Sequence, residues 1–531
     1  MKLGKSASGE RWRIRPDGPD KTTGKLAYLT DMRMDGMLWG KVLRSPHPHA
    51  GIVSIRTDKA RRMPGVRAVL THADVPGLNR FGIVTPDQPV FCEDRVRYVG
   101  DAVAAVAADT PELAALALEQ VEVEYVVLPL VTDPFQAQAK QAPKLHPGGN
   151  VLHRNQYGHG DADAEFARCA FIVEETYETP RQMHAYMETE GGLFVSEPGG
   201  RLTVYSATQH GYKDRMQLAR ILGKPESLVR IVSSPIGGSF GGKDELNVQP
   251  YGALLALATG RPVKMHHSRA ESVRAGLKRH PMTIRMKTGA DADGRLLAHR
   301  VEITADTGAY ATLGAEVLNF AIEHALGPYA FAAAEVTGVS VYTNNGVSGE
   351  FRGFGGNQVV FALEGQMDRL AKEAGADPWE FRRLNLRKPG DPGPVGQPIV
   401  PTDGASQVWR ELAESEFWRN RMARDRSLTA KSPWVRRGTG AALVMHGSGL
   451  GYGIPDPAGG MLALAADGKI EACFSYEEFG QGLLATLELM LIERFGFGAE
   501  DLRLVIGDTD LAPHGGSSSS SISASISRPT T

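Results

Sequence analysis

Three glycine-rich loops, each between a strand-like run and a helical run, are the strongest indication of this chain's fold and of the ligand it binds. They are PIGGSFGGKDE, from Pro235 to Glu245, FRGFGGNQ, from Phe351 to Gln358, and EFGQG, from Glu478 to Gly482. A loop between a strand and a helix can aim several backbone N–H groups at one anion. Glycine also lets the backbone approach a ligand closely, because it has no Cβ. Together the loops predict a cradle for a long polar ligand with anionic groups.

Neither of the common phosphate-binding fingerprints explains these loops. The first loop lacks the GxxxxGK[ST] pattern, and GGSFGG has the wrong spacing for a dinucleotide-binding turn. In the second loop, Arg352 offers a planar fork of donors that suits a phosphate group or an electron-rich ring system. The alternative is that the loops are three unrelated turns with structural roles only.

Length and charge narrow the class of protein. With 531 residues the chain should form two or three domains. Its formal net charge is only -2, which gives no sign of a nucleic-acid partner or of an anionic membrane surface. The opening MKLGKSASGE has no apolar core, and no run of about 18 apolar residues follows. We therefore expect a cytoplasmic protein without membrane segments.

The cysteine content bears on redox chemistry. The chain has 3 cysteines, Cys92, Cys169 and Cys473, which stand far apart and are expected to be buried thiols. An iron–sulfur cluster needs about four thiolates. If electrons pass through this protein, another polypeptide must carry them onward.

The distribution of elements predicts a mixed α/β (α+β) fold with three parts. The segments QAPKLHPGGN and KPGDPGPVGQP are rich in Pro and Gly and mark the expected boundaries. They divide the chain into residues 1–140, 141–390 and 391–531. The runs PELAALALEQ, YKDRMQLARILGK, NVQPYGALLALATG and GLLATLELMLIERF are expected to be helices. The serine-rich tail from Gly515 to Thr531 has the composition of a flexible linker.

Order and spacing of the loops resemble one known family. Thr208-Gln209, then Gly237 to Asp244, then Phe351 to Gly356, then Glu478 to Gly482 are similar to the motifs of the molybdopterin-binding large subunit of the xanthine dehydrogenase and aldehyde oxidase family. The runs VLRSPHPHAGIVSI and VGDAVAAVAAD resemble the α/β hammerhead domain of that family. The resemblance covers essentially the whole chain. It implies a hammerhead domain in residues 1–140 and two parts of a molybdopterin-binding region after it.

The resemblance also implies a cofactor and its contacts. Family members hold molybdenum through a pterin, so Gln209, Phe240 and Arg352 would lie near the metal without being side-chain ligands. Whether the pterin carries a cytosine dinucleotide is left open. The implied cofactor contacts are Gln209, Gly238, Phe240, Gly241, Arg352, Phe479, Gly480, Gln481, Ser520 and Ser521, which makes the serine-rich tail part of the site.

The implied reaction is hydroxylation of a substrate carbon with water as the oxygen source. Electrons would leave through a separate iron–sulfur subunit to a separate FAD subunit. The arginine that clamps purines in the family has no counterpart here, since Phe320 stands nearest to its place. A purine-like heteroaromatic and an aldehyde are therefore both open as substrates. The implied substrate contacts are Asp244, Phe320, Phe354, Leu450 and Tyr452.

One family motif has no counterpart in this sequence. The catalytic base of the family is a glutamate in a G-x-G-E motif, and no G-x-G-E occurs here. The resemblance therefore predicts a C-terminally truncated chain that needs a further polypeptide to supply the base. The alternative is a scaffold or assembly protein that keeps the fold without catalysis.

Overall fold

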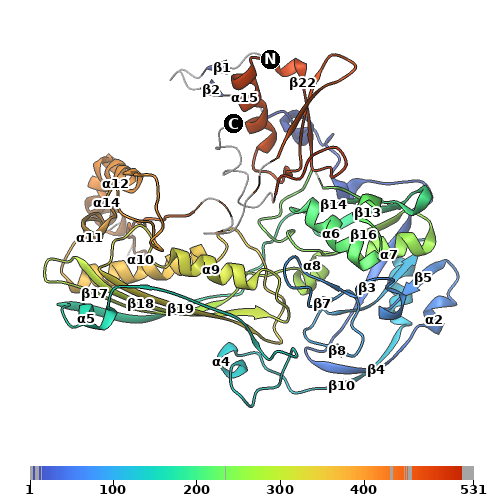
Figure 1. Ribbon diagram of the computed structural model, residues 1–531, viewed down its shortest axis with the longest axis horizontal. Coiled ribbons are helices and arrows are strands. Elements are labelled where there is room, and N and C mark those ends of the chain that lie inside the picture. The colour runs from blue at the N-terminus through green and yellow to red at the C-terminus, as the bar shows by residue number, and fades with distance from the viewer. Residues whose placement is uncertain are drawn as a thin grey trace.

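The structure, a computed structural model, describes residues 4–5, 11–12, 15–233, 235–430, 434–447, 449, 451, 457 and 459–516. Two large β-sheets lie on opposite sides of the molecule, and a smaller C-terminal sheet stands above the region between them (Figure 1). Helices cover the large sheets, so the predicted mixed α/β class is confirmed. Within the described residues, no helix combines the length and the apolar character needed to cross a membrane.

The first large sheet joins the N-terminal part of the chain to the region that carries the first glycine loop. Its strand order is β15-β14-β13-β16-β3-β9-β5, and the two regions meet where β16 runs parallel to β3. Val263 stands opposite Leu38 in that pairing. The seven strands are β3 (Leu38–Arg44), β5 (Val66–Leu70), β9 (Ala102–Ala108), β13 (Gly191–Ser196), β14 (Leu202–Ser206), β15 (Val229–Val232) and β16 (Val263–His266).

Small side chains let helices pack closely on this sheet. Every residue of β9, AVAAVAA, is buried, as expected for a strand covered on both faces. A methyl group at Gly252 would overlap the ring of Phe194, so α7 needs glycine where it crosses β13. Thr110 caps α3 by accepting a hydrogen bond from Leu113 N, and three of the predicted helices are confirmed: α3 (Pro111–Glu119), α6 (Gly211–Leu222) and α7 (Gln249–Thr259).

The second large sheet has the order β11-β19-β18-β17-β12, with β18 and β19 parallel. Helices α9 and α10 lie along the face that is uppermost in Figure 1, and their apolar residues form the largest core cluster with the strands below. The elements are β11 (Val151–His159), β12 (Phe171–Thr179), β17 (Met282–Ala290), β18 (Leu296–Gly308), β19 (Ala333–Tyr342), α9 (Gly314–His324) and α10 (Gly356–Glu373).

A group of shorter helices continues from α10. The side chain of Asp377 caps α11 by accepting hydrogen bonds from the amides of Trp379 and Glu380. Trp379 stacks on Trp409, with ring centroids 6.1 Å apart, and so ties the next helix to it. These helices are α11 (Pro378–Asn385), α12 (Gly404–Glu414), α13 (Glu416–Arg419) and α14 (Arg421–Ala430).

The C-terminal sheet has the order β20-β21-β22 and packs with α15. It is fastened to the end of β15, because Ser233 N donates to Gly507 O over 2.8 Å and Val232 forms a bridge with Asp508. The third glycine loop is therefore held beside the first sheet. The elements are β20 (Met461–Leu464), β21 (Ile470–Phe474), β22 (Leu502–Ile506) and α15 (Leu483–Phe495).

The segment 141–150, which has the composition of a linker, is a packed loop. Leu145 is buried, and the side-chain amide of Asn150 donates to the carbonyls of Ala137 and Pro143. The remaining short elements are β1 (Gly4–Lys5), β2 (Arg11–Trp12), β4 (Ala50–Arg56), β6 (Arg80–Phe81), β7 (Gln88–Pro89), β8 (Arg95–Val96), β10 (Glu122–Val127), α1 (Gly18–Thr22), α2 (Asp58–Arg61), α4 (Pro134–Ala137), α5 (Ala162–Phe166) and α8 (Arg269–Ala275).

Candidate functional site

The first glycine loop closes over Gln209, which follows β14. Gly241 N donates to Gln209 Oε1 over 3.0 Å, and Gln209 N donates to Lys243 O over 2.9 Å. Only 2% of Gln209 is exposed, so this pair of hydrogen bonds is shielded from water. The side chain that the family resemblance assigns to the metal is thus fixed against the loop that is expected to line it.

The second loop packs against the first, backbone on backbone. Arg352 N donates to Phe240 O over 2.9 Å. A Cβ built on Gly241 would lie 2.9 Å from the carbonyl of Glu350, closer than real Cβ contacts allow. Phe240 itself has a φ of 54°, which is uncommon for a residue with a side chain and indicates a conformation held by its surroundings.

The third loop reaches the same place from the C-terminal sheet. Ile236 N, at the start of the first loop, donates to Glu478 O over 3.0 Å. Three loops that are more than 100 residues apart in sequence are therefore joined by direct hydrogen bonds, together with Gln209. The expected convergence of the loops is confirmed.

The first loop presents backbone donors that the protein itself does not use. The amides of Gly238, Ser239 and Phe240 donate to no described residue, and the buried Ser239 Oγ likewise has no hydrogen-bond partner among them. Gly238 and Phe240 both have positive φ, and successive amides in such alternating conformations form a concave anion site. The exposed guanidinium of Arg352 also makes no hydrogen bond or ion pair within the described part of the chain. This donor set fits the phosphate-bearing pterin that the resemblance implies.

The third loop uses its donors differently. The carboxylate of Glu478 accepts from the amides of Gly480, Gly482 and Leu484, at the start of α15. The side-chain amide of Gln481 donates to Glu477 O and accepts from Phe479 N. The predicted contacts Phe479, Gly480 and Gln481 therefore lie beside the first loop, with the Gly480 amide and the Gln481 side chain engaged inside their own turn.

The expected substrate residues fall into three groups. Asp244 is buried beneath the first loop. Phe320 on α9 is also buried and meets Phe354 of the second loop edge to face, with centroids 5.8 Å apart. The other expected residues, Leu450 and Tyr452 for substrate and Ser520 and Ser521 for cofactor, lie outside the described residues.

Family comparisons agree with this layout. Residues 145–386 match the model described as molybdopterin cofactor-binding domain, and residues 411–529 match a second model with the same description. Residues 23–129 match the model for aldehyde oxidase and xanthine dehydrogenase, a/b hammerhead domain. The predicted hammerhead domain is confirmed by that match.

A curated relative decides the family. The chain is 58% identical over 514 residues to a probable xanthine dehydrogenase subunit of Bacillus subtilis, covering 97% of this chain and 68% of the relative. The chain belongs to the xanthine dehydrogenase and aldehyde oxidase family. It is also 42% identical over 402 residues to the nicotinate dehydrogenase large molybdopterin subunit of Eubacterium barkeri, covering 76% of this chain and 95% of that relative. Both relatives are named as subunits, and the family is one of oxidoreductases, as predicted.

Solved structures show the same fold. The aldehyde oxidoreductase of Desulfovibrio desulfuricans superimposes with a TM-score of 0.90 at 28% identity, over 95% of this chain and 57% of that one. Quinoline 2-oxidoreductase of Pseudomonas putida gives a TM-score of 0.86 at 26% identity, over 99% of this chain and 69% of that one. This family member thus spans a little more than half of the first structure and about two thirds of the second.

In this family member, the end of the first loop and the residue before the second loop carry three buried carboxyl groups, which we call the acid floor: Asp244, Glu245 and Glu350. Burial raises the pKa of Glu350 to about 8, and it raises the pKa values of Asp244 and Glu245 well above their ordinary values. At neutral pH Glu350 is therefore largely protonated. An anionic cofactor above it would meet little charge repulsion.

Three supporting residues were not predicted as part of the site. Lys243 of the first loop is buried and donates to the carboxylate of Glu188, which in turn accepts from Gly237 N over 2.7 Å. His184 stacks on Phe351 with centroids 4.1 Å apart, and burial lowers its pKa to about 4, so it is neutral. These contacts join residues that are far apart in sequence. They could not be predicted, because an isolated lysine or histidine in a sequence does not indicate which distant residue it contacts.

His446 was missed for a similar reason. It lies 5.1 Å from Phe320 and 5.4 Å from His324, measured between ring centroids, and Gly447 N donates to His324 Nε2. His446 comes from the segment before the C-terminal sheet, so it extends the aromatic wall formed by Phe320 and Phe354. Its position depends on how that segment folds back over α9.

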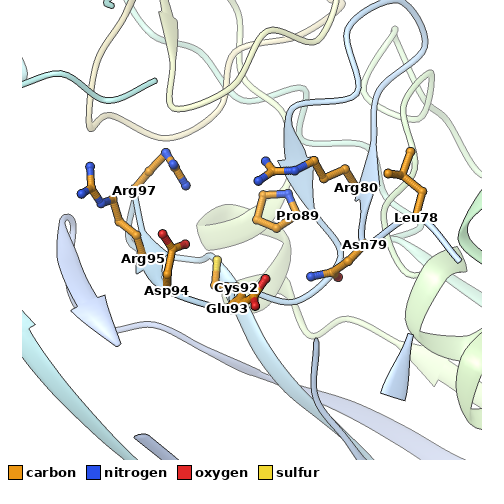
Figure 2. Close-up of a pocket in the computed structure, with 9 residues that line it drawn as sticks. All are labelled: Leu78, Asn79, Arg80, Pro89, Cys92, Glu93, Asp94, Arg95 and Arg97. Carbon is orange, nitrogen blue, oxygen red and sulfur yellow. The ribbon is translucent and has the colours of Figure 1, made fainter. Parts of the chain in front are cut away.

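A separate small pocket lies in the hammerhead domain. Its volume is about 90 Å3, and its charges include three arginines and two acids, so they nearly balance. Burial raises the pKa of the Cys92 thiol well above its ordinary value, which makes the sulfur a poor nucleophile. Nothing in this pocket links it to the glycine loops. Figure 2 shows the nine lining side chains: Leu78, Asn79, Arg80, Pro89, Cys92, Glu93, Asp94, Arg95 and Arg97.

Proposed function

We propose that the chain is the molybdopterin-binding subunit of a molybdenum hydroxylase that oxidises an electron-poor heteroaromatic ring or an aldehyde. The observation that carries the proposal is the hydrogen-bonded convergence of Gln209 with the three glycine loops. Gly241 N binds Gln209, Phe240 O accepts from Arg352 N, and Ile236 N donates to the third loop. Such a junction leaves unused amides at Gly238, Ser239 and Phe240, where a phosphate group could be held.

The aromatic wall supports this substrate class. The partly buried Phe354 of the second loop meets the buried Phe320 edge to face, and the exposed His446 continues the wall. Aromatic faces favour flat rings or small carbonyl compounds over extended polar substrates. The names of relatives and solved structures contain xanthine, nicotinate, quinoline and aldehyde. These compounds are heteroaromatic rings or small carbonyl compounds, as the proposal expects.

The bound cofactor would supply the two-electron oxidation, in which a C–H group and water give a C–OH group, two electrons and two protons. The residues of this chain would bind and orient the cofactor. Amides of the first loop and the Arg352 guanidinium would hold anionic groups, while Gln209 would keep the loop at a fixed distance. The protonated Glu350 of the acid floor would add little repulsion to an anionic cofactor bound above it.

Iron–sulfur and FAD subunits complete the proposed enzyme. The chain has only 3 cysteines, so clusters would reside on a partner. The pterin's nucleotide form and the cytoplasmic location remain predictions. The nicotinate relative, which three quarters of this chain matches over nearly its full length, is itself named a large molybdopterin subunit, which supports a complex of several subunits.

Metal analysis tests the proposal. The full chain, purified from its native cells together with its partner subunits, is expected to contain about one molybdenum per chain, and the complex is expected to turn over a heteroaromatic or an aldehyde with an artificial dye acceptor. Absence of molybdenum under every growth condition, with the fold intact, would support the scaffold alternative.

A further inference from the structure

An open groove is lined by α8 and by loop residues that follow β12, precede β17 and follow β19. Its volume is about 680 Å3. We call it the basic groove, because four of its eight lining residues are cationic and none is acidic. The lining residues are Val99, Arg181, Arg269, Ala270, Val273, Arg274, Lys278 and Gly346.

Most of the positive charge in the basic groove is not neutralised. Arg181 pairs with Asp306 over 2.7 Å. Arg269 and Lys278 donate only to backbone carbonyls, and Arg274 has no hydrogen bond or ion pair within the described part of the chain. Burial lowers the pKa of Lys278 to about 8, so an anionic neighbour would also favour its charged form.

Two acids lie near the groove without lining it, and the charge of one of them, Glu190, acts on Lys278. Glu190 lies behind Lys278, where it accepts from the Tyr186 hydroxyl and faces His267 over 3.6 Å. Glu271 on α8 accepts from Ser268 N over 2.7 Å and faces Lys41. The basic groove therefore presents a net positive surface on a chain whose overall charge is only -2.

Exposed apolar side chains surround these cations. Met187 is 93% exposed, Val273 on α8 is 50% exposed, and Val99 is 39% exposed. Methionine and arginine are both enriched at protein interfaces, whereas an isolated small-anion site needs no such apolar rim. This combination fits a protein surface with acidic and apolar residues.

The groove is directly connected to the candidate cofactor site. Arg269 donates to the carbonyls of Tyr186 and Met187, over 2.5 and 3.0 Å. A Cβ on Gly238 or Gly242 of the first loop would touch Tyr186 at 3.3 or 2.8 Å. On the other side, Arg279, next to Lys278, donates to Arg352 O over 3.1 Å. A protein docked here would sit one layer of residues behind the glycine loops.

From these observations we infer that the basic groove, together with Met187, is the docking face for an acidic surface of the iron–sulfur subunit. The inference rests on the proposed function, because it assigns to that subunit a place from which it can receive electrons. Opposite charges on the two faces would speed encounter and fix orientation, and the apolar rim would exclude water.

A double substitution tests the inference. Met187→Asp with Arg274→Glu changes two exposed side chains outside the loops, so the fold should be retained. The matched control is Leu116→Asp with Arg62→Glu, an exposed apolar and an exposed cationic residue of the hammerhead domain. Tagged chains are isolated from native cells. The measurements are molybdenum and iron per chain and the amount of iron–sulfur subunit identified by mass spectrometry.

The expected result is a loss of iron and of iron–sulfur subunit of about tenfold or more in the double variant, with molybdenum unchanged and the control like wild type. Equal iron in variant and wild type would overturn the docking face and leave the proposed function intact. A wild-type chain that brings no iron–sulfur subunit would overturn the proposed partner and, with it, this inference.

A photo-crosslinking residue at position 187 gives a measurement independent of affinity. It should capture the iron–sulfur subunit, whereas the same residue at position 62 should not. If position 187 captures no subunit, and inorganic phosphate stabilises the wild type but not Arg274→Glu against heat, the groove is a small-anion site and the docking inference is wrong.

Discussion

Gly241 and Glu350 touch through their backbones, and no side chain separates the first glycine loop from the second. A Cβ on Gly241 would lie 2.9 Å from both the carbonyl carbon and the carbonyl oxygen of Glu350. The spacing between the two loops is therefore set by the absence of a methyl group at one residue. The contact also places the Phe240 carbonyl within 2.9 Å of Arg352 N.

Replacing Gly241 should separate the loops. Gly241→Ala has to overcome both the contact with Glu350 and a φ of 99°, so we expect a large loss of bound molybdenum and a lower Tm. Gly375→Ala is the control, since its φ is 67° but nothing lies within 4 Å of the added methyl. The molybdenum content of the two purified variants tests whether the close contact at Gly241 is needed to retain the cofactor. Equal retention in both would contradict the close-contact argument.

Gln209 should be needed for cofactor content beyond its effect on stability. Gln209→Ala leaves the Gly241 amide without its acceptor, which should cost about 1–3 kcal/mol of unfolding free energy. Gln217→Ala is a control with a comparable loss of one buried hydrogen bond, because the equally buried Gln217 accepts from Gly82 N over 2.8 Å and lies outside the three glycine loops. Denaturant unfolding should place the two variants close together, while metal analysis should show molybdenum lost only in Gln209→Ala.

Arg352 should contribute to ligand binding without contributing to stability. Its guanidinium is exposed and has no partner among the described residues, so Arg352→Ala should change the free energy of unfolding by less than about 0.5 kcal/mol. Molybdenum and cofactor phosphate per chain should fall severalfold, with partial retention in Arg352→Lys. Arg62→Ala should leave both quantities unchanged. A substantial drop in stability for Arg352→Ala would indicate a structural role instead.

The acid floor should make stability fall as pH rises. The pKa of Glu350 is about 8 in the folded chain against an ordinary value of 4.5, so the folded state keeps a proton that the unfolded state releases between these values. The stabilising contribution is complete below about pH 4.5 and is lost as pH rises towards 8. Asp244 and Glu245 act in the same direction.

Glu350→Gln, which imitates the protonated acid, should therefore weaken this pH dependence and raise unfolding free energy at pH 8 by a few kcal/mol. Glu373→Gln, on the exposed side of α10, is the control and should keep the wild-type slope. Urea unfolding at pH 5, 6.5 and 8 measures the effect. A slope in Glu350→Gln as steep as in wild type would show that Glu350 is ionised in the folded chain.

Local signals in the sequence were sufficient for many elements. Thr110 and Asp377 cap their helices, and Gly260 ends α7 in a left-handed conformation, and each of these roles depends on neighbouring residues only. The glycine loops were also found from local pattern, and the family motifs placed Gln209 among them. Their hydrogen bonds to one another could be expected only from the resemblance.

Features that depend on packing between distant parts of the chain could not be predicted from the sequence. Glu350 looks like a solvent-exposed acid beside Gly349, and its burial follows from the way two distant loops close over it. Leu145 sits in a segment with the composition of a linker, yet it is buried because Asn150 folds that segment back on itself. The exposure of Met187 could not be predicted either, because it depends on how α8 lies beside this residue.

The pairing of β16 with β3 has a consequence for engineering. Because these two strands are neighbours in one sheet, the hammerhead domain and the region after it share that sheet, and neither region contains all of its strands. Transplanting residues 1–140 onto another enzyme would expose β3 and β16 as bare edges, which invite aggregation. Chimeras of this subunit should therefore exchange both regions as one block.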